Sequence, residues 1–280
     1  MGRPTHPAVC DDAAVNDRYT HGHHQSVLRS HRWRTAENSA AYLLARLEPG
    51  LEVLDVGCGP GTITLDLAAR VAPGRVVGLD LSADVVAEAE TARSEAGVAN
   101  AEFVVGDGYG LDFADASFDV VHAHQVLQHV ADPVAALVEM RRVLRPDGVL
   151  AVRDSDYHAF AWAPVDPLLD RWLELYTALT RHNGAECAAG RYLKKWVHAA
   201  GFTGLEVTSS NWTYTTADDR QWWGDLWADR VLQSSFATQA IEYGFSDEAE
   251  LAAIAAAWRR WSTADDAVFI VVHGEVLARP

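Results

Sequence analysis

The segment Val53–Thr62, with the sequence VLDVGCGPGT, places three glycines directly after a short apolar run. Glycine permits backbone conformations with positive φ and lets a ligand approach the main chain closely. A helix that starts after such a turn presents unpaired N–H groups to the ligand. Dinucleotide-binding enzymes share this kind of turn, but their G-x-G-x-x-G spacing requires a third glycine at position 62, which is threonine here. The segment therefore predicts a nucleotide-type site whose spacing argues against a bound pyrophosphate.

Polar and flat side chains follow the next two predicted strands. Asp80 closes the strand 76–80, about 20 residues beyond the last glycine, where a carboxylate accepts hydrogen bonds from ribose hydroxyls. Its neighbour Leu81 can lie against a flat base, and Asp107 with Gly108 can reach an exocyclic amine. The segment HAHQVLQHVADP (122–133) follows the fourth predicted strand at the same crevice.

Together these residues resemble the class I S-adenosylmethionine-dependent methyltransferases, in the group similar to ubiquinone and menaquinone C-methyltransferases. The resemblance covers about Tyr19 to Asp154, roughly half of the chain, and DVGCGPG is its most specific element. It implies that S-adenosylmethionine is the cofactor and S-adenosylhomocysteine the product. The cofactor-binding residues expected on this basis are Asp55, Gly57, Gly59 and Gly61 at the methionine part, Asp80 at the ribose and Leu81 and Asp107 at the adenine, with Cys58, Gly108 and Gln125 beside them.

The stretch from Tyr19 to Leu44 looks like the helical segment that closes over the cofactor in these enzymes. By that likeness Tyr19 and Arg34 meet the methionine end, where a guanidinium suits a carboxylate. Position 58 is often cysteine in such turns, so we expect Cys58 to be a small packing residue rather than a nucleophile.

Methyl transfer from a sulfonium is an in-line displacement, so alignment and exclusion of water can supply most of the acceleration. A base is needed only where the acceptor must lose a proton. The catalytic candidates are His24, His129 and Tyr157, because they flank the predicted strand ends where the methyl group must sit. Other histidines are weaker candidates: His122 and His124 share one side of a strand and are expected in the core or crevice, and the cluster His21, His23, His24 and His31 lacks regular metal-ligand spacing. We expect no metal site.

Ten tryptophans are many for 280 residues, and six of them fall in the late part of the chain: Trp212, Trp222, Trp223, Trp227, Trp258 and Trp261. Each of these could simply attach helices to the sheet. Collectively they favour a flat apolar pocket, because aromatic walls suit aromatic acceptors and can stabilise a cationic methyl donor. Tyr214, Trp222 and Trp223 are the expected substrate-binding residues. The acceptor predicted first is an indole or an indole-bearing cyclic dipeptide, and a quinone or phenol ring is second.

Three other functions use a similar sheet. A nicotinamide- or flavin-dependent oxidoreductase needs room for a pyrophosphate, and an aminopropyl transferase needs acidic residues for a polyamine. A non-catalytic cofactor-binding subunit is the third alternative. The aromatic-rich late segment favours an acceptor pocket over these.

The elements that position these residues alternate along the chain. Apolar segments at 51–57, 76–80, 101–107, 118–124 and 149–154 predict buried parallel strands. Helices are expected at 26–47, at 62–71, from Ser82 to Gly97 and after Asp132, with 145–148 as a turn. Further helices at 165–176 and 190–200 precede a strand at 204–216, helices across 217–263 and a last strand at 267–276.

The predicted fold is therefore α/β: a Rossmann-like, doubly wound, mostly parallel seven-stranded sheet with an antiparallel last strand. An N-terminal helical segment and a helical lid between the last two strands complete it. Residues 1–16 are expected to form a loose tail, and 17–280 a single domain with a cap (17–48), a cofactor-binding core (51–154) and helical substrate covers (155–200 and 217–264).

The overall composition limits the partners. The 39 acidic residues exceed the 23 Lys and Arg, giving a formal net charge of −16, so nucleic acid is not expected as a partner. The three cysteines, Cys10, Cys58 and Cys187, share no metal-ligand spacing. No leader-like or membrane-spanning apolar run occurs, so we expect a cytoplasmic protein that does not enter a membrane. The oligomeric state is left open.

Overall fold

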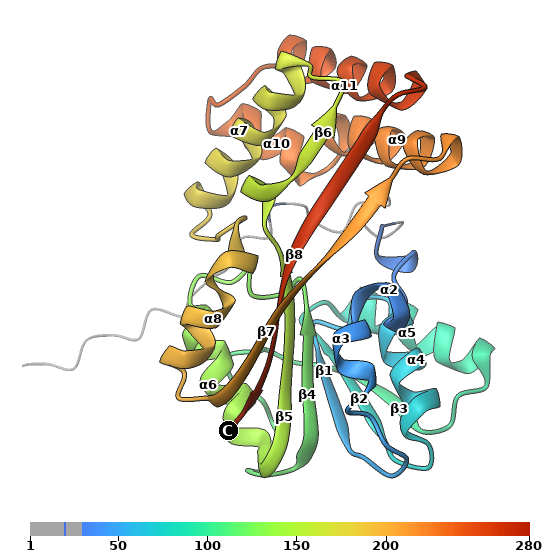
Figure 1. The fold of residues 1–280 in the computed structure, drawn as a ribbon, viewed down its shortest axis with the longest axis vertical. Coiled ribbons are helices and arrows are strands. Elements are labelled where there is room, and N and C mark those ends of the chain that lie inside the picture. Colours follow the sequence, from blue (N-terminus) through green and yellow to red (C-terminus); the bar gives the residue numbers. More distant parts are fainter. Residues whose placement is uncertain (1–19, 21–29) are drawn as a thin grey trace, which may run out of the picture.

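The computed structural model describes Thr20 and residues 30–280. Tyr19, His24 and the predicted tail 1–16 lie outside the described residues. In Figure 1 the chain forms a sheet flanked by helices, with a second group of helices gathered at one end of the longest strands.

Five parallel strands form the first part of the sheet, in the order β3-β2-β1-β4-β5. Their bounds follow the predicted apolar segments: β1 (Val53–Val56), β2 (Val76–Asp80), β3 (Ala101–Val105), β4 (Phe118–His124) and β5 (Leu144–Ser155). The pairing brings Asp55 of β1 beside Gly78 on one side and beside His122 on the other. The strand ends that carry the predicted site residues therefore meet at one edge of the sheet.

The helices between these strands begin and end at the predicted signals. Residues 57–61, which connect β1 to the next helix, form the glycine turn. Helix α4 (Thr62–Val71) follows this turn. Helix α5 (Ala83–Ala96) starts at Ser82, whose hydroxyl accepts from the N–H of Val85, and ends at Gly97 with φ of 66°. Helix α6 (Pro133–Val143) starts at Asp132, whose carboxylate caps the N–H of Ala135. Local capping chemistry thus sets where each helix enters and leaves the sheet.

Two long antiparallel strands complete the sheet. Strand β8 (Val268–Arg279) pairs with β7 (Thr203–Tyr214) along its length. Its other edge pairs with β5 through residues 273–278 and with the short β6 (Ala161–Ala163) through residues 268–270. The sheet thus has eight strands where seven were predicted. The additional strand, β6, has only three residues, too few to show a period of two.

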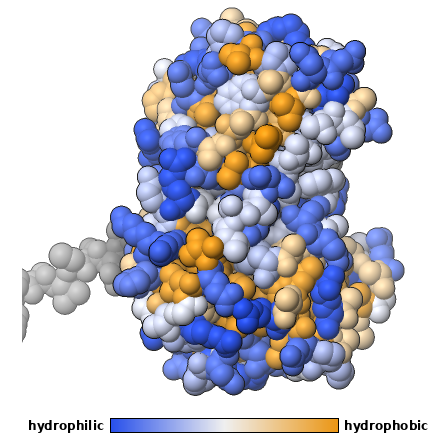
Figure 2. All heavy atoms as spheres, in the orientation of Figure 1, coloured by the Kyte–Doolittle hydropathy of each residue, from blue (hydrophilic) through white to orange (hydrophobic). Residues whose placement is uncertain are grey.

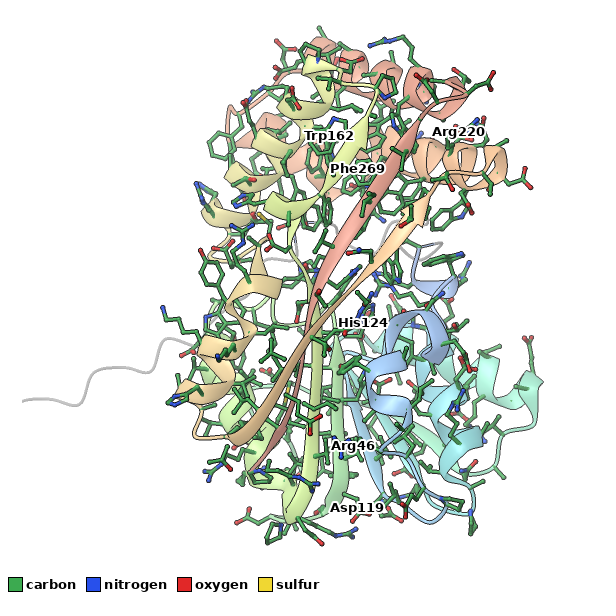
Figure 3. The ribbon with its side chains drawn as sticks, viewed as in Figure 1. Arg46, Asp119, His124, Trp162, Arg220 and Phe269 are labelled. Atoms are coloured by element: carbon green, nitrogen blue, oxygen red, sulfur yellow. The ribbon has the colours of Figure 1, made fainter. Side chains whose placement is uncertain are left out.

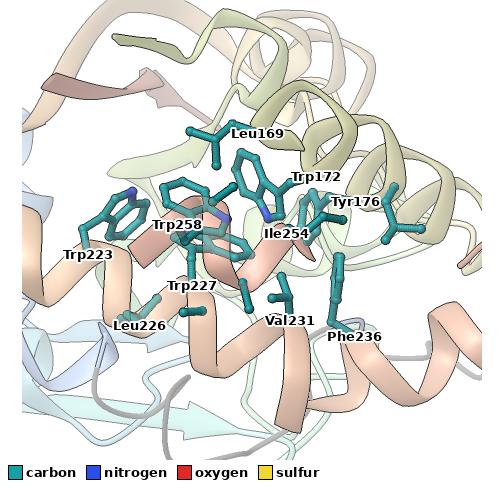
Figure 4. Close-up of a cluster of buried hydrophobic side chains, with 14 of the residues drawn as sticks. Leu169, Trp172, Tyr176, Trp223, Leu226, Trp227, Val231, Phe236, Ile254 and Trp258 are labelled. Carbon is teal, nitrogen blue, oxygen red and sulfur yellow. The ribbon is translucent and has the colours of Figure 1, made fainter. Parts of the chain in front are cut away.

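Four helices form a lobe around β6 and the far ends of β7 and β8: α7 (Pro167–His182), α9 (Ala217–Gln233), α10 (Ser235–Glu242) and α11 (Glu248–Thr263). Helix α8 (Ala189–Ala199) instead packs beside β5 and β8. The lobe has its own apolar core, in which Trp172, Trp227 and Trp258 are fully buried, and Figure 4 shows these rings packed between helices. The ring centres of Trp172 and Trp227 lie 4.5 Å apart.

The lobe lies beyond the carboxyl ends of the parallel strands, as expected for a helical insert that covers the ligand-binding edge. Figure 3 shows Asp119 at the start of β4 far from the lobe and His124 at its end toward the lobe. In the space-filling view the surface narrows on one side between the lobe and the rest of the sheet (Figure 2).

Two local predictions were wrong. The helix expected across 26–47 is interrupted in its described part, where residues 30–32 are helical and α2 (Ala36–Ser39) and α3 (Ala41–Leu44) follow as separate short helices. Thr35 starts α2 through a reciprocal capping pair with Asn38, which stabilises a new helix start inside the helix-favouring segment. Residues 145–148, expected as a turn, lie within β5 as an irregularity, where the pairing passes from Leu144 with Phe118 to Val149 with Val120.

Candidate active site

A cavity of about 500 Å³ lies between the glycine turn, the strand ends and the lobe. Its lining includes the turn after β1, the ends of β2 to β5, the segment from Ser30 to Arg34, and side chains of β7 and α9. This volume lies in the range of small-molecule sites. Residues from both halves of the chain therefore contribute to one site.

The glycine turn opens onto this cavity. Gly57 and Gly59 have φ of 70° and 56°, in the left-handed region. A Cβ on Gly57 would lie 2.4 Å from a methyl of Val126, whereas a Cβ on Gly59 would meet nothing closer than His31 Nδ1 at 3.7 Å. Gly59 thus leaves its backbone accessible to a ligand, and Gly57 makes room for the chain after β4.

Gly61 does not line the cavity, although it was expected at the methionine part. A Cβ at this position would lie 2.6 Å from the ring of Phe103. Its φ of 83° also favours glycine at the start of α4. The structure thus explains Gly61 by helix–strand packing.

Asp55 is buried at the bottom of the turn, and both of its carboxylate oxygens have partners inside the protein. Oδ2 accepts from the Thr64 hydroxyl at 2.6 Å, and Oδ1 lies 2.7 Å from His122 Nδ1. His122 is fully buried, as expected of a core histidine. These two bonds hold β1, β4 and α4 together directly below the turn.

Asp80, Leu81 and Asp107 line the outer part of the cavity. Asp80 accepts from the N–H of Gly59 and from that of Ser82, both at 3.0 Å. The Leu81 side chain is 69% exposed, so it presents an apolar surface at the mouth. Asp107 is exposed and its Oδ1 accepts from the N–H of Tyr109, while Gly108 lies beside it in the cavity wall.

Cys58 also lines the cavity but is buried, and burial raises the pKa of its thiol well above the ordinary value. The nearby carboxylates of Asp55 and Asp80 raise this pKa further. A thiol in this state is a poor nucleophile, since the thiolate is the reactive form.

Gln125 connects three parts of the site. Its Oε1 accepts from Arg34 Nη2 at 2.5 Å, and its Nε2 donates to the hydroxyl of Ser155 at 2.7 Å. The same Nε2 lies 2.9 Å from His273 Nε2 on β8. Gln125 adopts φ of 54°, which is unusual for a residue other than glycine and is typical of sites under functional constraint.

His129 lies in the cavity wall, where burial and the charges of Arg34 and Arg230 lower its pKa to about 3. Its Nε2 accepts from Gln128 Nε2 at 3.1 Å. Burial also lowers the pKa of His124 and His273 well below the ordinary value. All three imidazoles are therefore neutral at pH 7.

Aromatic rings form another part of the cavity wall. The Trp33 ring lies 5.2 Å from Trp212, 5.9 Å from Tyr214 and 5.6 Å from Trp222. Tyr214 stacks on Trp223 at 4.4 Å. Of the six late tryptophans, Trp212, Trp222 and Trp223 line the cavity, whereas Trp227, Trp258 and Trp261 pack in the lobe core.

Tyr157 also lines the cavity and stacks on Tyr176 at 4.2 Å. Trp33, Arg230 and Phe160 line it too, although the motifs in the sequence did not predict them as site residues. No local motif marks Arg230 or Phe160, which reach the cavity only through the folding of the later part of the chain. Trp33 alone carried a signal, as an aromatic residue next to Arg34.

Among the described residues, no group of three or more metal-ligating side chains is gathered. Within the same part of the chain, none of the helices combines the length and apolar character needed to cross a bilayer.

Comparison with known proteins identifies the family. Residues 47–219 match the model of a methyltransferase domain. An uncharacterized methyltransferase of Schizosaccharomyces pombe is 33% identical over 267 residues, covering 92% of this chain and 95% of that protein. The demethylmenaquinone methyltransferase of Beutenbergia cavernae is 36% identical over 187 residues, covering 62% of this chain and 72% of its own.

Among solved structures, the YcgJ protein of Bacillus subtilis has the same fold, with a TM-score of 0.55 and 20% identity over 92% of this chain and 98% of its own. The predicted Rossmann-like fold is thus confirmed, and the oxidoreductase and aminopropyl transferase alternatives lose their basis. The chain belongs to the class I S-adenosylmethionine-dependent methyltransferases.

Proposed function

We propose that the enzyme transfers the methyl group to a carbon or nitrogen of a small aromatic metabolite. An indole or an indole-bearing cyclic dipeptide is the first candidate. One observation carries this proposal: a single cavity extends from the glycine turn to a wall formed by Trp33, Trp212, Tyr214, Trp222 and Trp223.

The turn side of the cavity fits S-adenosylmethionine. The open backbone at Gly59 can receive the methionine part, and Asp80 lies beside it to accept hydrogen bonds from ribose hydroxyls. Leu81 and Asp107 then suit the base and its exocyclic amine. Arg34, which lines the cavity, suits the methionine carboxylate, and Tyr19 keeps the role that the family resemblance implies for it.

Asp55 contributes indirectly in this proposal. Because Asp55 is buried, unlike the partly exposed Asp80, and its oxygens are bonded to Thr64 and His122, it fixes the shape of the turn. Gly57 and Gly61 act in the same way, through the space that their missing side chains leave.

When bound, S-adenosylmethionine supplies an electrophilic methyl group, which the acceptor attacks in line with the carbon–sulfur bond. The chain must therefore hold a flat acceptor at a fixed angle and exclude water. The parallel rings of Tyr214 and Trp223, with an interplanar angle of 11°, provide a rigid surface for this. Aromatic faces also stabilise a nearby cation, as the methyl donor is.

A proton must leave if the acceptor atom carries one. His129 has the right place in the cavity wall, but a pKa of about 3 makes it a weak base at neutral pH. We therefore assign His129 the role of orienting the acceptor by hydrogen bonding. His24 and Tyr157 stay in the proposal as candidates for accepting the proton, and Tyr157 lines the cavity.

A quinone or phenol ring is the second candidate acceptor. The relative from Beutenbergia cavernae is described as a demethylmenaquinone methyltransferase, and its similarity covers 62% of this chain. The same aromatic wall would hold such a ring.

The experiment has two steps. Calorimetric titration should first give micromolar affinity for S-adenosylmethionine and S-adenosylhomocysteine, equivalent to about −7 to −9 kcal/mol. The enzyme is then incubated with S-adenosylmethionine and separate indoles, cyclic dipeptides, quinols, phenols and aliphatic amines, and methylated products are detected by mass spectrometry. Turnover of aliphatic amines with none of the aromatic compounds would contradict the proposal.

A further inference from the structure

Charged side chains of both signs line the cavity. Among the described residues, the carboxylates in its wall are Asp55, Asp80 and Asp107, which lie at or just after the ends of β1, β2 and β3. The two arginines in the wall, Arg34 and Arg230, come from the N-terminal segment and from α9. Charges in a poorly hydrated cavity interact strongly, so an arginine that faces the acceptor favours an electron-rich group over a cation.

Arg230 is held in a defined orientation. It is buried, its Nη2 donates to the hydroxyl of Ser30 at 3.1 Å, and its guanidinium carbon lies 4.7 Å from the centre of the Trp227 ring. The ring and the serine restrict the plane of the guanidinium. A guanidinium has five N–H donors in a rigid planar fork, so one held in this way can direct donors at an oxygen atom.

The two arginines have different roles. Arg34 donates to Gln125, which is tied to the sheet through Ser155, and the proposed function places it at the methionine carboxylate. Arg230 belongs to the lobe, on the same helix as Trp222 and Trp223 of the aromatic wall. His129 and both arginines line the same cavity, and the two positive charges lower the pKa of His129. Arg230 is thus the cationic group of the acceptor side.

We infer that Arg230, oriented by Ser30 and Trp227, binds a carbonyl-type oxygen of the methyl acceptor. This inference rests on the proposed function and narrows its substrate class. The acceptor is then an aromatic compound that carries a carboxylate or an amide carbonyl beside the ring. Both groups present an sp² oxygen whose lone pairs can accept from a guanidinium. A carboxylate also carries a negative charge, which strengthens the bond.

The test measures binding of ring-matched compounds to the full chain saturated with S-adenosylhomocysteine. Indole-3-acetate, indole-3-acetamide, 3-ethylindole and tryptamine are titrated, and 4-hydroxyphenylacetate is compared with 4-ethylphenol. We expect the compounds with a carbonyl to bind about 10- to 100-fold more tightly than those without, as for a hydrogen bond to a charged group. Comparing the affinities of indole-3-acetate and indole-3-acetamide shows whether the site prefers a carboxylate or an amide carbonyl.

The variant Arg230→Met should abolish this preference while leaving the affinity for S-adenosylhomocysteine unchanged. Arg220→Met is the matched control, because Arg220 is also buried on α9 but donates to the carbonyl of Thr215 and does not line the cavity. Figure 3 shows Arg220 within the lobe, apart from His124. This control should keep the preference of the wild-type protein.

Other outcomes overturn the inference in distinguishable ways. If 3-ethylindole or tryptamine binds wild-type protein as tightly as the carbonyl compounds, the inference is wrong and the aromatic acceptor stands. If S-adenosylhomocysteine binds but none of the aromatic compounds does, the proposed acceptor class fails together with the inference. The wild-type series decides the question even if Arg230→Met does not fold.

Discussion

Arg34 and Gln125 are 91 residues apart in the sequence, and their side chains meet at the cavity wall through a 2.5 Å hydrogen bond. Gln125 in turn donates to Ser155 and lies 2.9 Å from His273. The amide thus fixes where the guanidinium lies relative to β5 and β8. The backbone of Gln125 has φ of 54°, which is unfavourable for a residue with a side chain. The contact is therefore maintained at the expense of local backbone strain.

The first prediction concerns this contact. Gln125→Leu should weaken binding of S-adenosylmethionine by about 1 to 2 kcal/mol, because the acceptor that orients Arg34 is lost. Gln125→Glu keeps that acceptor and should lose less affinity. Titration calorimetry measures both, with the exposed Gln221→Leu on α9 as the control. Unchanged affinity in Gln125→Leu would show that Arg34 does not depend on this residue.

The second prediction concerns Asp80. Asp80→Ala should weaken cofactor binding by about 1.5 to 3 kcal/mol, because a charged acceptor for two hydroxyls is removed. The cofactor affinity of Asp80→Asn should lie between those of the wild type and Asp80→Ala, since asparagine keeps one oxygen for the N–H of Gly59 or Ser82. Asp84→Ala, at an exposed position in the first turn of α5, is the matched control. Wild-type affinity in Asp80→Ala would mean that Asp80 has been misassigned.

The parallel core could be predicted from the sequence because its signals are local. Each strand is a short apolar segment, and Ser82, Gly97 and Asp132 carry the caps that end or begin helices. The break before α2 escaped prediction because alanines and leucines around it favour helix, and because the local capping pair of Thr35 and Asn38 has asparagine where the usual capping box has Glu or Gln.

For the acceptor side of the site, the sequence could predict that the pocket is aromatic but not all of the residues that form it. The abundance of tryptophan indicated an aromatic pocket, but no spacing rule places Trp33 of the N-terminal segment beside Trp212 and Trp222. The neutral state of His129 could not be predicted from the sequence either. It depends on burial and on the charges of Arg34 and Arg230, which lie far away in the sequence.

The third prediction separates the pocket tryptophans from each other. Trp222→Ala should raise the acceptor KM with little effect on folding, because this ring is only partly buried. Trp223→Ala should raise KM and also lower the free energy of unfolding by about 3 to 5 kcal/mol, because its ring packs in the lobe core. Cofactor affinity should change in neither variant. Steady-state kinetics and denaturant unfolding measure these effects, with Trp258→Phe as a control inside the core.

The fourth prediction concerns the pH dependence of turnover. Because the pKa of His129 is about 3, it cannot produce a limb near pH 6–7, where an ordinary histidine titrates. His129→Gln should therefore lower kcat without removing such a limb. A limb that disappears only in His24→Gln would identify His24 as the base. Loss of the limb in His129→Gln would contradict the orienting role proposed for His129.

The fifth prediction concerns the pH dependence of stability. An unfolded histidine binds a proton below about pH 6.5, whereas folded His129 does so only below about pH 3. Between these values the unfolded chain holds one more proton, so folding stability falls as the pH falls. One such proton corresponds to about 1.4 kcal/mol per pH unit. Urea unfolding of His129→Gln should therefore show a slope smaller by about this amount between pH 6 and pH 4.

Asp154 should make folding stability change with pH in the opposite direction to His129. Burial raises the pKa of this carboxyl to about 8, although the N–H of Gln128 donates to it. Between about pH 4 and pH 8 the folded carboxyl holds a proton that the unfolded one has lost, so stability falls as the pH rises. Asp154→Asn has the same shape without titrating, and its stability should decline less between pH 6 and pH 8. Equal slopes in the variant and the wild type would show that Asp154 is ionised in the folded protein.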